Sequence, residues 1–353
     1  MKKHNFSAGP SILPQEVLEQ ASKAIIELDD IGLSLIEISH RSKEFVSIME
    51  EASERVINIT GLKNKGYKVI FVQGGASLQF LMTAYNLLEK KAAFINTGTW
   101  SVKAIKEAKR LGQVIEVSSS KEKNFNYIPK EFNIPEDANY LHITTNNTIF
   151  GTQYKSFPST GISLVADMSS DIFSRKIDYS LFDLFYAGAQ KNMGPAGVTL
   201  VVIKENILGK VTREIPSMLD YFSYINAGSM PNTPPVFAVY TTLLNLRWIE
   251  SQGGIEELGK RNKLKARILY DEIDRNSSFS GFAQIEDRSE MNVTFTLKNE
   301  RKSIDFDKIC DSNGINGLKG HRSVGGYRAS IYNALPIESV ELLIQCMQQF
   351  EKI

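Results

Sequence analysis

Apolar positions recur along the chain at two different spacings. Two early stretches have helical spacing: one opens at Pro14 and runs to about Leu28, and the other begins after Ser42 and closes at Gly61. Short runs rich in β-branched and aromatic residues follow. Several are apolar nearly throughout, which is typical of strands covered on both faces. The runs predicted as strands are Lys68–Val72, Ala92–Asn96, Val114–Ser118, Tyr140–Thr144, Ser163–Asp167, Leu184–Ala187 and Val198–Ile203.

Helical segments separate some of these runs, notably Leu78–Leu88 and Val102–Leu111, the second closed by Gly112. Alternation of this kind predicts an α/β fold with a largely parallel sheet of about seven strands. Two long helices, from about Val236 to Gly253-Gly254 and through Leu258–Ile273, follow the last run. After them we expect strands at Gly281–Ile285 and Met291–Leu297 and helices near Asp305–Asn313 and Ile337–Phe350.

This pattern divides the chain in two. We predict a large domain over residues 1–255 and a smaller α+β domain over residues 256–353, in keeping with the size at which single cores stop growing. No low-complexity linker separates the two parts. A long helix is therefore expected to bridge them.

Composition narrows the class of protein. Lys plus Arg number 41 and Asp plus Glu number 40, a net charge of +1, which argues against non-specific binding to nucleic acid or anionic membranes. The N-terminus lacks an apolar signal-peptide core and no run of 18 apolar residues occurs, so we expect a cytoplasmic protein. Cys310 and Cys346 are expected to be buried thiols, and with four scattered histidines they form no metal-binding spacing.

A small-residue turn after the first predicted strand is the first candidate binding element. Gly74, Gly75 and Ala76 lead from Lys68–Val72 into a helix, so free amides at the helix start could hold a phosphate. A Gly-Gly turn that opens a helix has a purely structural role about half the time. The segment matches neither Gly-x-Gly-x-x-Gly nor the Walker loop, so a dinucleotide or nucleoside triphosphate site is not supported.

Asp167 and Lys191 each follow a predicted strand. Both are therefore expected at the edge of the sheet where open α/β folds bind ligands. Small residues such as Gly188 and Gly194 flank the lysine and leave space around its amine. A desolvated lysine loses its proton readily and can attack an aldehyde, and a nearby carboxylate can keep a pyridine nitrogen protonated. The alternative is an ordinary surface lysine.

Basic residues form a third candidate element. Two of the four histidines are followed directly by arginine, at His40-Arg41 and His321-Arg322, and Arg328 comes shortly after the second pair. Guanidinium groups grip phosphate or carboxylate oxygens in two places, so these residues suit an anion site. Solvated surface loops are the alternative. The segment Asn232-Thr233-Pro-Pro is a further candidate for binding. Its prolines stiffen the turn, and the side-chain amide of Asn232 and hydroxyl of Thr233 are donors that could reach a ligand.

Together these segments resemble the phosphoserine aminotransferase family, in class V of the fold-type I pyridoxal phosphate enzymes. The resemblance covers nearly the whole chain. Its most specific segments are Ser39-His-Arg-Ser-Lys-Glu-Phe, Gln73-Gly-Gly-Ala-Ser-Leu-Gln-Phe, Ala187-Gly-Ala-Gln-Lys-Asn-Met-Gly-Pro-Ala-Gly, Asn232-Thr-Pro-Pro and Gly320-His-Arg-Ser-Val-Gly-Gly-Tyr-Arg-Ala-Ser.

The resemblance implies a pyridoxal 5′-phosphate site. Lys191 resembles the lysine that forms the Schiff base with the cofactor and shuttles a proton, and Asp167 resembles the partner of the pyridinium nitrogen. Trp100 resembles the ring stacked on the cofactor, and Thr148 a threonine that contacts it. The resemblance places the cofactor phosphate on Ala76, Ser77 and Gln190, with Asn232 and Thr233 from the other subunit of a homodimer with shared sites.

The substrate side follows from the same resemblance. Arg328 resembles the residue that binds the α-carboxylate, and the first residues, with Ala8, resemble a segment that reaches the site. His40, Arg41, His321 and Arg322 match a pocket for a distal phosphate or the γ-carboxylate of glutamate. One departure concerns the phosphate turn, which reads Gly-Ala-Ser where some relatives carry Gly-Gly-Arg.

The resemblance implies reversible transamination between 3-phosphohydroxypyruvate and L-glutamate, giving O-phospho-L-serine and 2-oxoglutarate in serine biosynthesis. Use of the four-carbon phosphorylated oxoacid of pyridoxine biosynthesis stays open. The alternatives are an alanine–glyoxylate type aminotransferase, a cysteine desulfurase and a non-catalytic anion-binding protein. A desulfurase needs a mobile cysteine, whereas Cys310 lies in a helical pattern.

Overall fold

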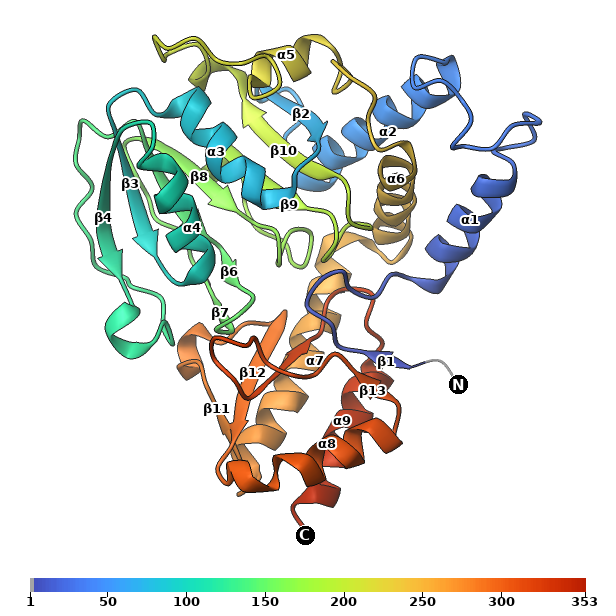
Figure 1. The fold of residues 1–353 in the computed structure, drawn as a ribbon, viewed down its shortest axis with the longest axis vertical. Coiled ribbons are helices and arrows are strands. Elements are labelled where there is room, and N and C mark those ends of the chain that lie inside the picture. Colours follow the sequence, from blue (N-terminus) through green and yellow to red (C-terminus); the bar gives the residue numbers. More distant parts are fainter. Residues whose placement is uncertain (1–2) are drawn as a thin grey trace.

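The computed structural model describes residues 3–353, and a seven-stranded sheet forms its centre (Figure 1). The strand order is β2-β10-β9-β8-β5-β3-β4, and all neighbours are parallel except β10, which runs antiparallel to β2 and β9. All seven predicted strands are present. Their bounds are β2 Tyr67–Val72, β3 Lys91–Asn96, β4 Gln113–Ser119, β5 Tyr140–Thr144, β8 Ser163–Asp167, β9 Leu184–Gly188 and β10 Thr199–Lys204.

Helices cover both faces of this sheet, which explains the uninterrupted apolar strands. On β5, Tyr140 packs into a core shared with α3 (Gly75–Leu87) and α4 (Thr99–Ala108). Its neighbour Leu141 packs into the opposite core with α1 (Gln15–Ile26), α2 (Lys43–Thr60) and α6 (Val236–Ser251). Successive residues of one strand thus belong to different cores, as the period of two requires.

Local sequence signals account for most helix ends. The Ser42 hydroxyl accepts a hydrogen bond from the amide of Phe45 and caps α2, and Gly61 ends that helix with a left-handed φ of 66°. The predicted helix at residues 102–111 is displaced. The helix α4 begins at Thr99 and ends at Ala108, because the chain tightens into turns there and the amide of Gly112 bonds back to the carbonyl of Ala108.

A second core lies below the large sheet in Figure 1. An antiparallel sheet of three strands packs on three helices, and the ring of Phe279 contacts those of Phe295 and Phe306. The strand β1 (His4–Asn5) pairs with β13 (Ile315–Asn316), so residues 4–5 lie against this unit. Its other elements are α7 Gly254–Arg275, β11 Phe279–Gly281, β12 Asn292–Leu297, α8 Ser303–Ser312, β14 Tyr327–Ser330 and α9 Ile337–Phe350.

Two details of this unit differ from the sequence prediction. The strand predicted at Gly281–Ile285 is wrong: β11 ends at Gly281, and Ile285–Asp287 is a single 3-10 turn. The Asp287 carboxylate accepts a 2.8 Å hydrogen bond from the amide of Ile128 in the large domain, which draws the chain out of the sheet. β14 was not predicted, because it has only four residues, although its apolar and polar residues alternate. The domain boundary after residue 255 falls inside the continuous helix α7 and stays a prediction.

Candidate active site

Lys191 lies on the turn that follows β9, at the carboxyl edge of the sheet. Its ammonium donates a 2.8 Å hydrogen bond to the hydroxyl of Thr148, which lies between the short strands β6 (Asn146–Asn147) and β7 (Thr152–Gln153). The Lys191 Nζ atom is 5.6 Å from the centre of the Trp100 ring at the start of α4. Three predicted site residues from separate segments therefore meet here.

Burial lowers the pKa of Lys191, which allows it to react as a free amine. Desolvation lowers the pKa of Lys191 to about 8, the charge of Asp167 raises it, and the charge of Arg328 lowers it further. A pKa this close to neutrality leaves a useful fraction of free amine. Lys191 is therefore suited both to attack a carbonyl carbon and to carry a proton.

Asp167 is the last residue of β8, the strand beside β9. It is only 4% exposed, and its Oδ1 atom accepts a 2.9 Å hydrogen bond from the amide of Ser169. Burial raises the pKa of this carboxyl, while the charge of Lys191 and the hydrogen bond from Ser169 lower it. A carboxylate held in such surroundings favours a cationic partner, such as a protonated ring nitrogen.

The predicted phosphate turn opens α3. Gly74 and Gly75 have left-handed φ values of 92° and 66°, which a side chain would strain, and Ala76 and Ser77 lie in the first helical turn. Amides of a first turn have no acceptor within their own helix, so they are free to bind an anion. Gln190, the other predicted phosphate ligand, directly precedes Lys191.

The N-terminal segment lies against Lys191. The amide of Ser11 donates a 2.9 Å hydrogen bond to the carbonyl of Gln190, and the Ser11 hydroxyl bonds the carbonyl of Lys191. A Cβ on Gly9 would lie 3.2 Å from Cγ of Lys191. The carbonyl of Ala8 accepts a 2.8 Å hydrogen bond from the Tyr332 hydroxyl, which ties the segment to the second unit.

A basic cluster lies beside the lysine. Burial lowers the pKa of His321, and the charges of Arg328, Arg322 and Lys103 lower it further, so these four side chains act on one another. The sequence reasoning missed Lys103. Its Nζ atom lies 4.5 Å from the centre of the Trp100 ring, and the spacing of three residues on α4 was the signal that could have found it.

Two predicted pairs are not brought to Lys191 within this chain. His40 and Arg41 lie on the connection between α1 and α2. In the described part of the chain, the buried Nε2 atom of His40 has no hydrogen-bond partner. Asn232 and Thr233 lie between α5 (Tyr221–Asn226) and α6, where the Thr233 carbonyl accepts a 3.2 Å hydrogen bond from the Gln73 side chain.

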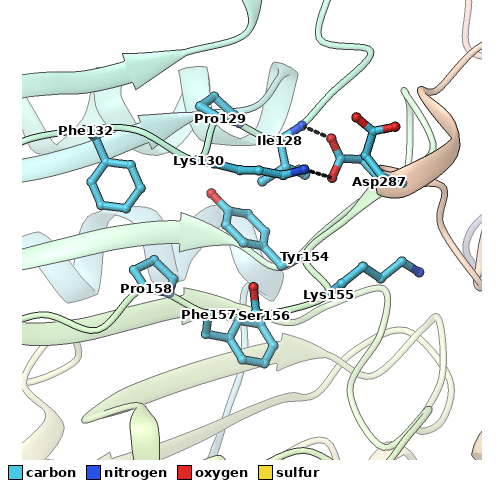
Figure 2. Close-up of a pocket in the computed structure, with 11 residues that line it drawn as sticks. Ile128, Pro129, Lys130, Phe132, Tyr154, Lys155, Ser156, Phe157, Pro158 and Asp287 are labelled. Atoms are coloured by element: carbon cyan, nitrogen blue, oxygen red, sulfur yellow. Dashed lines mark hydrogen bonds and ion pairs between the residues drawn. The ribbon is translucent and has the colours of Figure 1, made fainter.

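A separate cavity of about 360 Å³ contains none of the predicted site residues (Figure 2). Its walls combine the aromatic rings of Tyr154 and Phe157 with Lys130 and Asp287. The Asp287 carboxylate faces the Ile128 amide and lies 3.9 Å from the Lys130 ammonium. Lys130 and Asp287 thus pair with each other in this cavity, whereas no carboxylate of residues 3–353 forms an ion pair with Arg328, Arg322 or Lys103.

Comparison with known proteins decides between the class V alternatives. Residues 3–343 match the Aminotransferase class-V family. The chain belongs to the class-V aminotransferases. It is 60% identical over 353 residues to the phosphoserine aminotransferase of Flavobacterium psychrophilum, with 99% of each chain covered, and 61% identical to that of Flavobacterium johnsoniae over the same shares.

Solved structures of the family agree in fold. The phosphoserine aminotransferase of Bacillus circulans subsp. alkalophilus has a TM-score of 0.96 at 44% identity, with 99% of both chains covered. A structure of a pyridoxal phosphate-bound phosphoserine aminotransferase from Trichomonas vaginalis has a TM-score of 0.93 at 36% identity, covering 98% of this chain and 100% of that one. The predicted fold-type I architecture and the resemblance to phosphoserine aminotransferases are confirmed.

In this class-V aminotransferase, the residues around Lys191 fit pyridoxal phosphate. Within the described residues, the Trp100 indole N–H and the Arg328 Nε are buried without a hydrogen-bond partner. Buried donors usually have a partner, so both atoms suit a site built for an anionic ligand. Lys191 supplies the amine, Asp167 the charge for the ring nitrogen, Trp100 an aromatic surface and the start of α3 the amides for a phosphate.

Two further observations bear on the alternatives. Cys310 and Cys346 are free and buried, as expected, and Cys310 lies within α8, which is unsuitable for the mobile cysteine of a desulfurase. No helix in residues 3–353 has the length and hydropathy needed to span a membrane.

Proposed function

We propose that this chain catalyses reversible amino transfer between L-glutamate and 3-phosphohydroxypyruvate, giving 2-oxoglutarate and O-phospho-L-serine. The observation that carries the proposal is the meeting of Lys191, Asp167 and Arg328 at one edge of the sheet, where their charges shift the pKa of Lys191. Full-length relatives named phosphoserine aminotransferase support the same reaction.

Each side chain of the proposed site has its own role in this reaction. Bound pyridoxal phosphate supplies the electron-withdrawing ring that makes the Cα proton of an amino acid removable. Lys191 would hold the cofactor through its amine, and the same amine, when free, would carry that proton between Cα of the substrate and C4′ of the cofactor. Thr148 orients the amine through its 2.8 Å hydrogen bond. Asp167 maintains a negative charge for the ring nitrogen, and Trp100 covers one face of the site.

The basic cluster accounts for a substrate with two anionic ends. Arg328 binds the α-carboxylate, and His321 and Arg322 bind the distal phosphate or the γ-carboxylate of glutamate. Arginine forks pair with either group in a bidentate manner, so one pocket serves both amino-group donors. Lys103 adds a fourth charge that acts on His321.

His40, Arg41, Asn232 and Thr233 belong to the same site only if a second subunit brings them there. We propose a homodimer with shared sites, in which the first pair reaches the distal anion and the second pair reaches the cofactor phosphate. Exposed apolar side chains on and beside α1, including Ile26 and Leu33, support a second subunit near this region.

The four-carbon phosphorylated oxoacid of pyridoxine biosynthesis is a second proposed substrate, because the pocket needs only a carboxylate and a distal phosphate. We also propose a cytoplasmic location, to be checked by cell fractionation.

A coupled assay tests the reaction. Purified protein loaded with pyridoxal phosphate is given O-phospho-L-serine and 2-oxoglutarate, and glutamate is measured. The four-carbon phosphorylated substrate and the pair alanine and glyoxylate are compared. We expect the phosphorylated substrates to react far faster than alanine. Preference for alanine and glyoxylate would assign the chain to the other branch of class V, and a colourless protein that borohydride does not modify would mean a non-catalytic one.

A further inference from the structure

A buried lysine outside the active site holds the junction between the large domain and the second unit. Lys265, on α7, is 3% exposed. Its ammonium donates hydrogen bonds to the carbonyls of Ile331 at 3.0 Å, Tyr332 at 2.7 Å and Leu335 at 3.0 Å. An ammonium has three donors, so the three carbonyls satisfy it completely, whereas a neutral amine would leave one carbonyl without a donor.

Burying the ammonium group of Lys265 costs free energy of folding, so its presence here calls for an explanation. Burial lowers the pKa of Lys265 to about 7, and the charge of Arg261 acts in the same direction. Among the described residues, the hydrogen-bond partners of this charge are carbonyls of one turn, residues 331–335. A buried lysine of this kind is rarely retained unless its hydrogen bonds organise the surrounding backbone.

The turn at 331–335 is bonded to the neighbourhood of the catalytic lysine. The amide of Asn333 donates a 3.0 Å hydrogen bond to the side chain of Asn192, the residue after Lys191. The Asn333 side chain donates another of 3.0 Å to the carbonyl of Phe173 in the large domain. The turn therefore contacts the large domain at two points, one of them adjacent to the catalytic residue.

The same turn continues from the strand that carries the substrate-binding arginine. Arg328 lies on β14, which ends at Ser330, and the turn begins with the next residue. The Tyr332 hydroxyl bonds the carbonyl of Ala8, so the N-terminal segment is tied to it as well. A shift of the turn would displace Arg328 relative to Lys191.

Helix α7 spans both sides of this junction. Asn262, three residues before Lys265 and on the same helical face, donates to the carbonyl of Ser174 in the large domain at 2.8 Å and to the Asn333 side chain at 2.7 Å. One face of α7 thus bonds the large domain through Asn262 and the turn through Lys265.

We propose that Lys265 is a positioning residue: by binding the carbonyls of residues 331–335 it sets the distance between Arg328 on the second unit and Lys191 on the large domain. The kinetic part of this inference rests on the proposed function. The structural part does not, because it concerns only how the turn is held.

Lys265→Met tests it, since methionine approximates the apolar stem and removes all three donors. Lys263→Met, at an exposed position on the same helix, is the matched control. The cofactor-binding residues lie on the large domain, so we expect the Lys265 variant to bind pyridoxal phosphate with an unchanged absorption spectrum. We expect KM for O-phospho-L-serine to rise more than kcat falls, with kcat/KM lower by roughly tenfold to a hundredfold, because small displacements of a substrate-binding group have costs of this size.

Hydrogen–deuterium exchange is the readout that does not depend on activity. In Lys265→Met, amides of residues 331–335 should exchange faster than in the wild type, while those of β5 and β8 stay protected. A lysine needed only for overall stability would instead give uniformly faster exchange and an unchanged KM, and that result overturns the proposal. If the wild type shows no transamination, the proposed function fails while the exchange experiment still tests Lys265.

Asn333→Ala provides a second test if Lys265→Met does not fold. It leaves the lysine and its three carbonyls in place and removes the side-chain bonds of the turn to the carbonyl of Phe173 and to Asn262. The same rise in KM and the same local exchange are expected. Normal KM and normal exchange in this variant contradict the inference.

Discussion

Asp167 ends β8, and Lys191 follows the neighbouring parallel strand β9. The charge of each residue shifts the pKa of the other in the direction that favours the charged side chain. Burial opposes both charges. The pair therefore places a lysine that can lose its proton near neutral pH beside a carboxyl whose negative charge is favoured by the positive charge of that lysine and opposed by burial. Such opposed shifts in one site are typical of groups that take part in acid–base chemistry.

Replacing Lys191 by alanine should leave a folded protein that binds the cofactor only non-covalently. Among the described site residues, Lys191 is the amine that lies against Thr148 and Asp167, so we expect kcat to fall by several orders of magnitude. Borohydride reduction followed by peptide mapping checks the assignment. Cofactor trapped on another lysine of the wild type would contradict it.

Asp167→Asn keeps the shape of the side chain and removes its charge. The bound ring then withdraws electrons less well, so kcat should drop much more than KM rises. Steady-state kinetics with O-phospho-L-serine provide the measurement. An unchanged kcat would mean that another group faces the ring nitrogen.

Cofactor attachment should depend on pH through Lys191. Because its pKa is lowered to about 8, the rate of covalent attachment to cofactor-free protein should rise with pH up to about 8 and level off above it. Asp167 raises this pKa and Arg328 lowers it, so Asp167→Asn should move the inflection to lower pH and Arg328→Met to higher pH. Stopped-flow absorbance detects the shifts. Inflections that move together in one direction would exclude these two charges as the cause.

Shared sites predict complementation between inactive chains. Lys191→Ala chains mixed with chains carrying both Asn232→Ala and Thr233→Ala should regain activity after subunit exchange, because each hybrid dimer contains one intact site. Exchange is followed by mass spectrometry of tagged subunits. Demonstrated exchange without recovered activity argues that Asn232 and Thr233 act within their own subunit or not at all.

The choice between substrates should distinguish the roles of Arg41 and Arg322 from that of Arg328. A substrate without a distal anion leaves a desolvated basic cluster unpaired, so alanine should react at least about a thousandfold more slowly in kcat/KM than phosphoserine. Truncating Arg41 or Arg322 should reduce activity on phosphoserine far more than on alanine, whereas truncating Arg328 should reduce both. Equal losses on the two substrates in Arg41→Ala and Arg322→Ala would show that the phosphate pocket is elsewhere.

Much of the large domain follows from local sequence. All seven strands were predictable as short runs rich in β-branched and aromatic residues, and several are apolar nearly throughout because helices pack on both faces of the sheet. Asp167 and Lys191 were predictable as neighbours because the carboxyl ends of parallel strands share one edge. The ends of α2 followed from Ser42 and Gly61, whose capping roles depend on adjacent backbone alone.

Other features needed the tertiary structure, because they depend on segments distant in sequence. The sequence predicted a strand up to Ile285, but the hydrogen bond between Asp287 and Ile128 turns the chain away from the sheet. Lys103 on α4 joins the basic cluster only because folding brings it near His321, and Thr148 meets Lys191 only because the β6–β7 hairpin lies against the turn that follows β9.

Lys265 shows the same division most clearly. On α7, Lys265 lies on the buried face at helical spacing with Leu258 and Leu269, so periodicity indicates a buried position, but no local pattern indicates which groups bind its charge. The three carbonyls that bind it lie 66 to 70 residues further along the chain. The sequence by itself therefore determined the strands, the caps and the residue types of the chemistry, since these depend on neighbours in the chain. Which charges face one another was decided by long-range packing, because pKa values and buried hydrogen bonds depend on distances that only the folded chain sets.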